Sequence, residues 1–226
     1  MKKTNIIHLL LVFFLTLFSW STVMGSISTK PDWSKSNNNH VDLSGNKLTF
    51  TLPGNISQDF PMSLLKSVNI YENNTDEEWE RHSVAEIWWD YKKQTMLIFP
   101  EILGRLKLKI AVYHSKKNDV NLNGEKQLTK GITALYTFAY SDSKGSDFRI
   151  PKQFEPTRIK DKIWLKYAVI DKKGRIEGSR YAIAITESHI FEVTFQISKT
   201  ADYNDSNWYE VVQKDIDKLI DSFQLK

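Results

Sequence analysis

Alternating hydrophobic and polar positions dominate the second half of the chain and predict antiparallel strands. Residues 162–171, 179–186 and 189–198 each alternate, and a Gly-containing turn and a Glu187-Ser188 turn separate them. A period of two is typical of strands that bury one face. The three segments therefore predict an antiparallel meander.

The region from residue 41 to residue 112 predicts further strands. Residues 41–43 and 48–52 alternate on either side of Gly45-Asn46, which indicates a hairpin with a two-residue turn. Residues 106–112 alternate in the same way, and residues 67–74 form a possible additional strand. The segment 75–82 is expected to be an acidic loop or a single helical turn.

Hydrophobic residues at steps of three and four predict two helices. Leu128, Ile132, Leu135 and Ala139 favour a helix over residues 125–140, although Gly131 and the neighbouring β-branched and aromatic residues also suit a strand. From residue 207 to residue 223 the pattern is clearer, with charged residues filling the opposite side. We expect an amphipathic helix to close the domain.

Trp88 and Trp89 lie side by side in a segment that alternates as a strand. Ala85, Ile87, Trp89 and Tyr91 then share the core face, whereas Glu86, Trp88 and Asp90 share the other. Two interpretations of Trp88 remain open. It lies beneath a helix in a sheet covered on both faces, or it is partly exposed on a face that binds a partner.

The order of these elements resembles the PsbP/Mog/DcrB-like family. Leu52-Pro53-Gly54 at the end of an early strand and Ser222-Phe223 at the end of the last helix carry the resemblance. It implies an α+β fold, an α/β/α sandwich in which an antiparallel sheet has helices packed on its faces and an amphipathic C-terminal helix closes the domain. It also implies binding or accessory roles rather than catalysis, and it assigns no catalytic residue.

The N-terminal residues indicate export from the cytoplasm. Lys2 and Lys3 precede an apolar run over residues 6–18, which is the layout of a secretory signal peptide over residues 1–25. Residues 26–40 are polar without a period and predict a flexible segment, followed by a single domain over residues 41–226. We therefore predict Sec-dependent export to the periplasm, with no membrane span after cleavage.

Composition excludes several classes of partner and chemistry. The chain has no cysteine, so disulfides, thiolate metal sites and lipid-anchored lipoproteins are excluded. Removing Lys2 and Lys3 lowers the basic count from 31 to 29 against 27 acidic residues, a balance that does not indicate nucleic-acid binding.

The candidate catalytic and metal-binding motifs are incomplete. Ser63 and Lys66 match an SxxK pattern that lacks its usual companion motifs, and no histidine pair has metal-ligand spacing. Residues 119–124 resemble the start of a calcium loop, but Lys130 occupies the closing carboxylate position. The acidic stretch 76–80 is not expected to form a carboxylate pair across a cleft. We therefore predict no enzyme activity, no metal and no cofactor.

The remaining hypothesis is a binding protein with a protein partner. Its most concrete form is an immunity protein that neutralises a toxin of an interbacterial secretion system such as type VI, and the alternative is a DcrB-like envelope accessory or stress protein. The residues expected to contact the partner are Asp76, Glu77, Glu78, Glu80, Trp88, Asp119, Asp142 and Asp147.

Overall fold

The computed structural model describes residues 27–93, 100–117, 120–141, 149–171, 173–199 and 206–226. The predicted signal peptide, residues 1–25, lies outside this part of the chain. Within the described residues, no helix is both long enough and apolar enough to cross a membrane.

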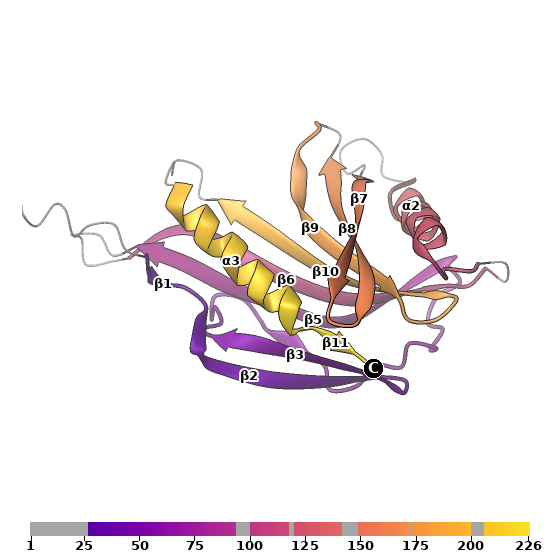
Figure 1. The fold of residues 1–226 in the computed structure, drawn as a ribbon, viewed down its shortest axis with the longest axis horizontal. Coiled ribbons are helices and arrows are strands. Elements are labelled where there is room, and N and C mark those ends of the chain that lie inside the picture. Colours follow the sequence, from indigo (N-terminus) through magenta and orange to yellow (C-terminus); the bar gives the residue numbers. More distant parts are fainter. Residues whose placement is uncertain (1–26, 94–99, 118–119, 142–148, 172, 200–205) are drawn as a thin grey trace, which may run out of the picture.

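A large antiparallel sheet forms the body of the molecule (Figure 1). Its strands follow the order β1-β5-β6-β10-β9-β8-β7, and β4 pairs with the outer side of β5. The strands are β1 (Ile27–Thr29), β4 (Ser63–Leu64), β5 (Trp79–Lys93), β6 (Glu101–Ser115), β7 (Arg149–Ile159), β8 (Lys162–Asp171), β9 (Ile176–Ala184) and β10 (His189–Lys199). The long strands β5 and β6 run along the molecule, whereas β7, β8 and β9 stand upright in Figure 1.

A small three-stranded sheet lies beside the large one and contains the predicted hairpin. Its order is β11-β3-β2, with β2 (Asp32–Leu43), β3 (Asn46–Gly54) and β11 (Gln224–Leu225). Leu43 pairs with Asn46, so the turn residues are Ser44 and Gly45, with φ angles of 54° and 96°. Two positive φ angles match the twist that a two-residue hairpin requires. The predicted hairpin with a two-residue turn is confirmed, but its turn lies one residue earlier than the expected Gly45-Asn46.

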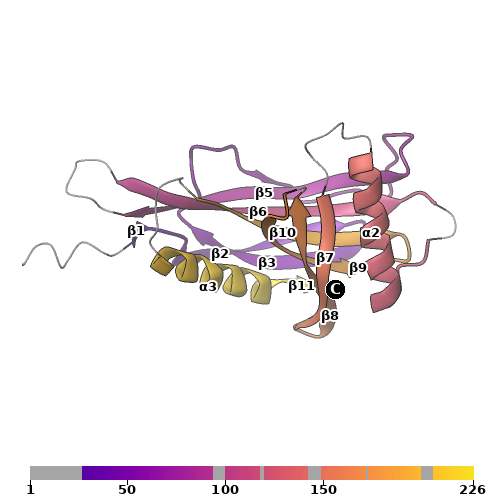
Figure 2. The same ribbon diagram turned by 90° about the horizontal axis from the view of Figure 1, so that it is seen from above.

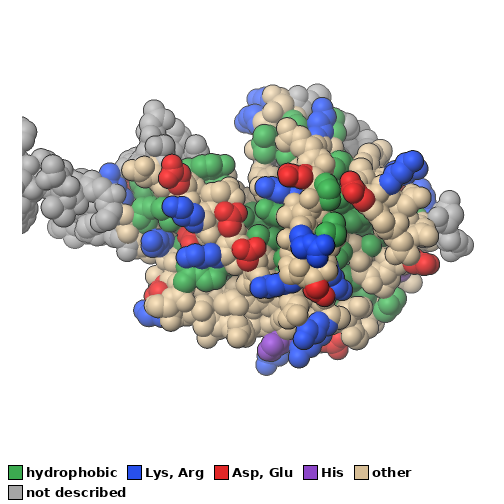
Figure 3. All heavy atoms as spheres, viewed as in Figure 1, with side chains coloured by type: hydrophobic (Ala, Val, Ile, Leu, Met, Phe, Trp, Pro, Cys, Tyr) green, Lys and Arg blue, Asp and Glu red, His purple; other side chains and the backbone are tan. Residues whose placement is uncertain are grey.

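The main core lies between one face of the large sheet and a layer made of the small sheet and helix α3 (Ser206–Ser222). Trp89, Tyr91 and Phe195 of the large sheet are fully buried there, as is Trp208 of α3. Phe223, just after α3, stacks on Phe50 of β3 with ring centroids 5.0 Å apart. The opposite side of α3 faces solvent with mixed charges (Figure 3).

A second core lies on the other face of the large sheet, at the end formed by β8 and β9. Helix α2 (Glu125–Ser141) packs Leu128, Ile132 and Leu135 into a cluster that also contains Tyr167 and Ala182. Figure 2 shows α2 at this end of the molecule and α3 along its side. The predicted helix over residues 125–140 is confirmed, and so are the meander and the C-terminal helix.

The predicted α/β/α sandwich is wrong, because the chain is mostly β with two antiparallel sheets. A small sheet, not a helical layer, forms much of the cover on one face, and a single helix covers part of the other. The sequence pattern missed strands whose side chains face solvent on both sides. β7 and the first half of β2 are of this kind, with mainly exposed or half-buried residues.

Three local predictions also need correction. Residues 79–82 begin β5, although the segment 75–82 was expected to be an acidic loop or a helical turn. Residues 27–29 and 32–40 lie in β1 and β2, not in a flexible segment, because backbone pairing with β5 and β3 does not require hydrophobic side chains. Residues 67–74 form no strand, apart from an isolated bridge between Ser67 and Asp42. This segment lies over one end of the main core and buries Ile70.

Candidate functional site

The candidate site is the face of β5, β6 and β10 that points away from the main core, called here the polar face. Alternation along each strand places polar and charged side chains on this face opposite the buried set. Pairing aligns Trp88 with Lys107 and Gln196, and aligns Glu86 with Lys109 and Thr194. The polar face consists of Glu86, Trp88, Asp90, Arg105, Lys107, Lys109, Glu192, Thr194 and Gln196, with Arg180 of β9 next to Thr194.

Trp88 is half-buried on the polar face, and Trp89 is fully buried in the main core. Phe60 stacks on the Trp88 ring with centroids 4.5 Å apart, and the Lys107 ammonium lies 4.1 Å from the ring centroid. A loop residue therefore covers Trp88 in place of the helix that the first interpretation expected. The other edge of the Trp88 ring borders a shallow cavity of about 290 Å³ beside Gln196 and Ser198.

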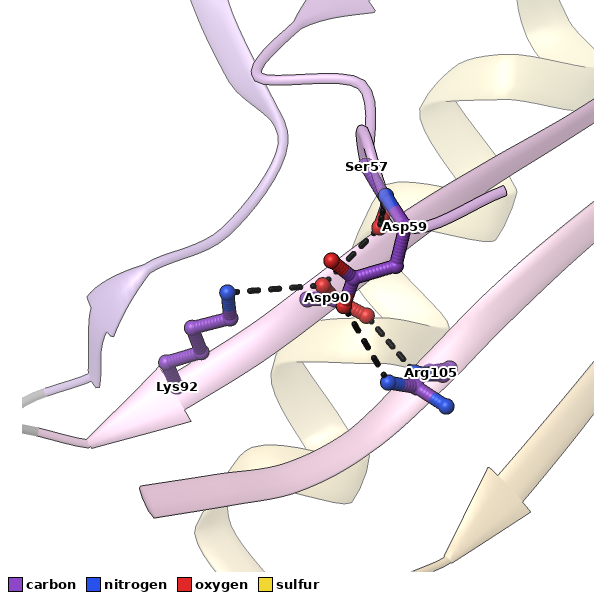
Figure 4. Close-up of polar contacts among 5 residues, drawn as sticks. All are labelled: Ser57, Asp59, Asp90, Lys92 and Arg105. Carbon is purple, nitrogen blue, oxygen red and sulfur yellow. Dashed lines mark hydrogen bonds and ion pairs between the residues drawn. The ribbon is translucent and has the colours of Figure 1, made fainter. Parts of the chain in front are cut away.

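A buried carboxylate fixes this loop to the polar face (Figure 4). Asp90 is only 4 % exposed, and it accepts hydrogen bonds from Ser57 Oγ at 2.9 Å and from Arg105 Nε at 2.8 Å. Lys92 lies 3.5 Å from the same carboxylate, and Arg105 also contacts Asp59 at 3.4 Å. Because burial leaves Asp90 dependent on these partners, the loop carrying Ser57 and Phe60 is held in one position.

Lysine side chains dominate the middle of the polar face. Lys107 forms an ion pair with Glu86 across the β5–β6 pair. Burial lowers the pKa of Lys109, and the neighbouring charge of Lys107 lowers it further. Two ammonium groups thus share the neighbourhood of one carboxylate.

Beyond Lys109 the polar face deepens into a cavity of about 410 Å³. Its lining comes from β5, β6, β9 and β10 and from α2 and β7, and comprises Arg81, Glu86, Lys109, Ala111, Tyr113, Ala139, Arg149, Arg180, Glu192, Thr194 and Gln196. This cavity is termed the cationic cavity below, since four of its side chains are basic and two are acidic.

Glu192 forms the centre of a buried network at the floor of the cationic cavity. It is 2 % exposed, pairs with Arg180 at 3.2 Å and accepts a hydrogen bond from Thr194 Oγ1 at 2.9 Å. The hydroxyl groups of Tyr136 and Tyr167 also donate to it. Burial raises the pKa of both tyrosines and the Glu192 charge raises it further, so both stay protonated and act as donors.

The predicted acidic contact stretch does not form one solvated surface. Asp76 and Glu77 are exposed, whereas Glu78 pairs with Lys117 at 2.6 Å. Glu80 is 4 % exposed and pairs with Lys116 at 2.9 Å, and the hydrogen bond from Lys116 holds the pKa of Glu80 below its usual range. Asp119, Asp142 and Asp147 lie outside the described residues.

Three histidines that are far apart in the sequence meet at one end of the large sheet, on its core side. His114 and His189 are cross-strand partners whose rings stack 4.2 Å apart, and His82 lies on the neighbouring strand β5. Nε2 of His189 lies 2.8 Å from the carbonyl oxygen of Ile70 and Nδ1 lies 2.7 Å from Thr186 Oγ1, which fixes the segment 67–74 above it. Among the described residues, no group of three or more acidic and histidine side chains has the geometry to hold a metal ion.

Sequence reasoning selected Trp88 as a candidate contact residue but did not predict the cationic cavity. Arg81, Lys109, Arg180 and Glu192 come from four different strands, so no local motif contains them. The available signal was that Glu192, Thr194 and Gln196 alternate with apolar residues in one strand, because polar residues need partners when they are buried.

No protein-family model, curated protein or solved structure matches this chain. The resemblance to the PsbP/Mog/DcrB-like family therefore stays a prediction, without the sandwich fold that it implied.

Proposed function

We propose that this chain is a non-enzymatic periplasmic binding protein that holds a protein partner against its polar face. In its most concrete form it is an immunity protein that neutralises a secreted interbacterial toxin of the type VI kind. The observation that carries this proposal is Trp88, a half-buried aromatic ring at the centre of a charged sheet face.

The surroundings of Trp88 suit protein recognition. Binding energy in protein interfaces concentrates in large aromatic and arginine side chains that are held in place and surrounded by polar groups. Trp88 is held between Phe60 and Lys107, and Arg105 lies 4.7 Å from the centroid of the Phe60 ring. A partner that presents acidic groups around an apolar patch would complement these cations.

The charged groups of this face also support binding more than catalysis. Asp90 and Glu192 already accept hydrogen bonds from neighbouring side chains, and the hydroxyls beside Glu192 donate to it. A catalytic base needs a reactant within hydrogen-bond reach and a free lone pair directed at it. The signal-peptide layout and the lack of cysteine support a soluble periplasmic location.

A survival assay tests the proposal. Cells that express a toxin encoded beside this gene, directed to the periplasm, are expected to survive only when this chain is co-expressed. Trp88→Ala is expected to weaken the purified toxin complex by at least about tenfold, since interface aromatics commonly contribute 2 kcal/mol or more. Affinity is measured by calorimetry.

Tyr209→Ala is the matched control. Tyr209 is an exposed aromatic on the outer side of α3, on the other side of the molecule from the polar face, and its loss should leave affinity unchanged. Equal survival with and without this chain would contradict the immunity proposal. In that case, an isolated gene position and a role in envelope stress would favour the accessory alternative.

A further inference from the structure

Among the described residues, the lining of the cationic cavity has more basic than acidic side chains. Its two carboxylates are already paired: Lys107, which lies outside the lining, binds Glu86, and Arg180 binds Glu192. Tyr136, Tyr167 and Thr194 occupy further acceptor positions of Glu192. Glu86 is therefore shared among Lys107, Lys109 and Arg81.

Arg81 and Lys109 are the basic side chains of the lining that come from β5 and β6. Arg81 is exposed at the mouth and lies beside the Tyr113 hydroxyl, and Lys109 is half-buried. Glu86 attracts Lys109, but Lys107 and Arg81 repel it, and together with burial this lowers its pKa. Arg149 of β7 also lines the cavity. An anion between Arg81 and Lys109 would relieve their mutual repulsion.

The volume of the cavity and the polarity of its lining limit the kinds of ligand that it can bind. A volume of about 410 Å³ falls in the range of small-molecule sites but is too small for a folded segment of a partner. The lining offers donors from arginine, lysine, threonine and tyrosine. Guanidinium and ammonium donors converging on one space are the groups that bind carboxylate and phosphate oxygens.

We infer that the cationic cavity binds a small anionic group through carboxylate or phosphate oxygens, with Arg81 and Lys109 as its principal ligands. The inference is drawn from the lining of the cavity alone, and it does not depend on the proposed protein partner. Its anion is either a free small molecule or an acidic side chain that a partner inserts.

Calorimetry with citrate and, separately, with inorganic phosphate tests the site on the purified chain from residue 26 onward. Saturable binding is expected for at least one of the two anions. Arg81→Gln and Lys109→Gln should each weaken it by about tenfold, the loss typical of one charge-assisted hydrogen bond. Arg81 is exposed, so its substitution should not perturb folding, and circular dichroism confirms this for both variants.

Lys47→Gln provides the matched control, because it removes the same charge from an exposed position on β3 in the small sheet. The affinity of this variant for the anion should equal that of the unmodified chain. Absence of saturable binding by both anions up to about 10 mM, in the range of the weakest specific sites, would overturn the inference. Equal weakening by all three substitutions would also overturn it, because it would indicate attraction to net charge only.

A competition experiment distinguishes the two sources of the anion. If saturating citrate displaces a partner protein, an acidic side chain of that partner occupies the cavity. If partner affinity is unchanged by citrate, the cavity serves a free small anion. Because the anion measurements contain no partner, their outcome is separate from that of the proposed function.

Discussion

His189 connects a single side chain to the pH dependence of stability. It is completely buried, and burial lowers its pKa from 6.5 to about 4, with further lowering by His114 and His82. Burial also lowers the pKa of His82 and of His114, which lie beside Glu80 and Lys116. Folding therefore keeps all three imidazoles neutral at pH values where the unfolded chain protonates them.

This arrangement predicts lower stability in mild acid. Between pH 6.5 and about 4 the unfolded chain binds a proton at His189 that the folded chain does not, so the contribution of His189 to the free energy of unfolding falls as pH falls and is constant above this window. The loss attributable to His189 approaches about 3 kcal/mol at the acidic end. Urea denaturation at a series of pH values measures it.

His189→Gln should flatten this slope, because an amide near the Nε2 position still reaches the Ile70 carbonyl without titrating. His40→Gln, at an exposed position of β2, should keep the original slope. An unchanged slope in His189→Gln would show that other groups determine the acid sensitivity.

At the residue scale, alternation correctly predicted which neighbouring tryptophan is buried, because the period of two in β5 is local information. It gave no information on what covers Trp88. Phe60 reaches Trp88 only because Ser57 and Asp59 contact Asp90 and Arg105. Contacts between a loop and a strand face depend on the tertiary fold, so no spacing in the sequence predicts them.

At the element scale, the packing of α3 on β6 depends on a single glycine. A Cβ atom on Gly104 would lie 2.4 Å from Cη2 of Trp208 and 2.7 Å from the carbonyl oxygen of Ser198. These distances are too short for any contact, so α3 can pack here only against a residue without a side chain. The glycine permits close approach rather than an unusual backbone angle.

Gly104→Ala is expected to lower the free energy of unfolding by about 1–3 kcal/mol, the usual cost of overpacking a core. The cost should be smaller in a Trp208→Phe background, since phenylalanine lacks the ring atoms that would clash. Urea denaturation of the four proteins gives the coupling energy. Strictly additive effects would show that Trp208 does not limit this position.

The elements that the sequence predicted are those with one buried face, such as β3, β8, β10 and α3. β7 was missed because Pro151 and Pro156 interrupt it and few of its side chains are buried. An edge strand tolerates proline, since one side of its backbone needs no partner. Its hydrogen bonds with β8 leave little trace in the hydrophobic pattern.

At the scale of the whole molecule, the layers could not be predicted from the sequence. Amphipathic helices and half-buried strands are compatible with several stacking arrangements, because each pattern specifies a buried face but not what covers it. Here the hairpin β2–β3 separates from the large sheet and covers it together with α3. The cationic cavity forms on the opposite face, where α2 covers only one end.

The last residues of the chain belong to the small sheet and are part of the fold. β11 pairs with β3, Lys226 and Lys47 exchange two backbone hydrogen bonds of 3.0 and 2.9 Å, and Leu225 is only 4 % exposed. Removing residues 224–226 exposes one edge of β3 and the apolar surface beneath Leu225. We expect a loss of about 2–5 kcal/mol, comparable to deleting a large core side chain and enough to unfold much of a marginally stable domain.

Thermal and urea denaturation measure this loss, and Gln224→Ala is the control because it keeps the backbone pairing and the buried leucine. If the hairpin β2–β3 depends on this closure, its amides should lose protection from hydrogen exchange in the truncated chain while those of β6 and β10 keep theirs. Equal protection and equal stability in both proteins would mean that α3 alone holds the small sheet in place. The small sheet would then be an independent cover rather than one fastened by the C-terminus.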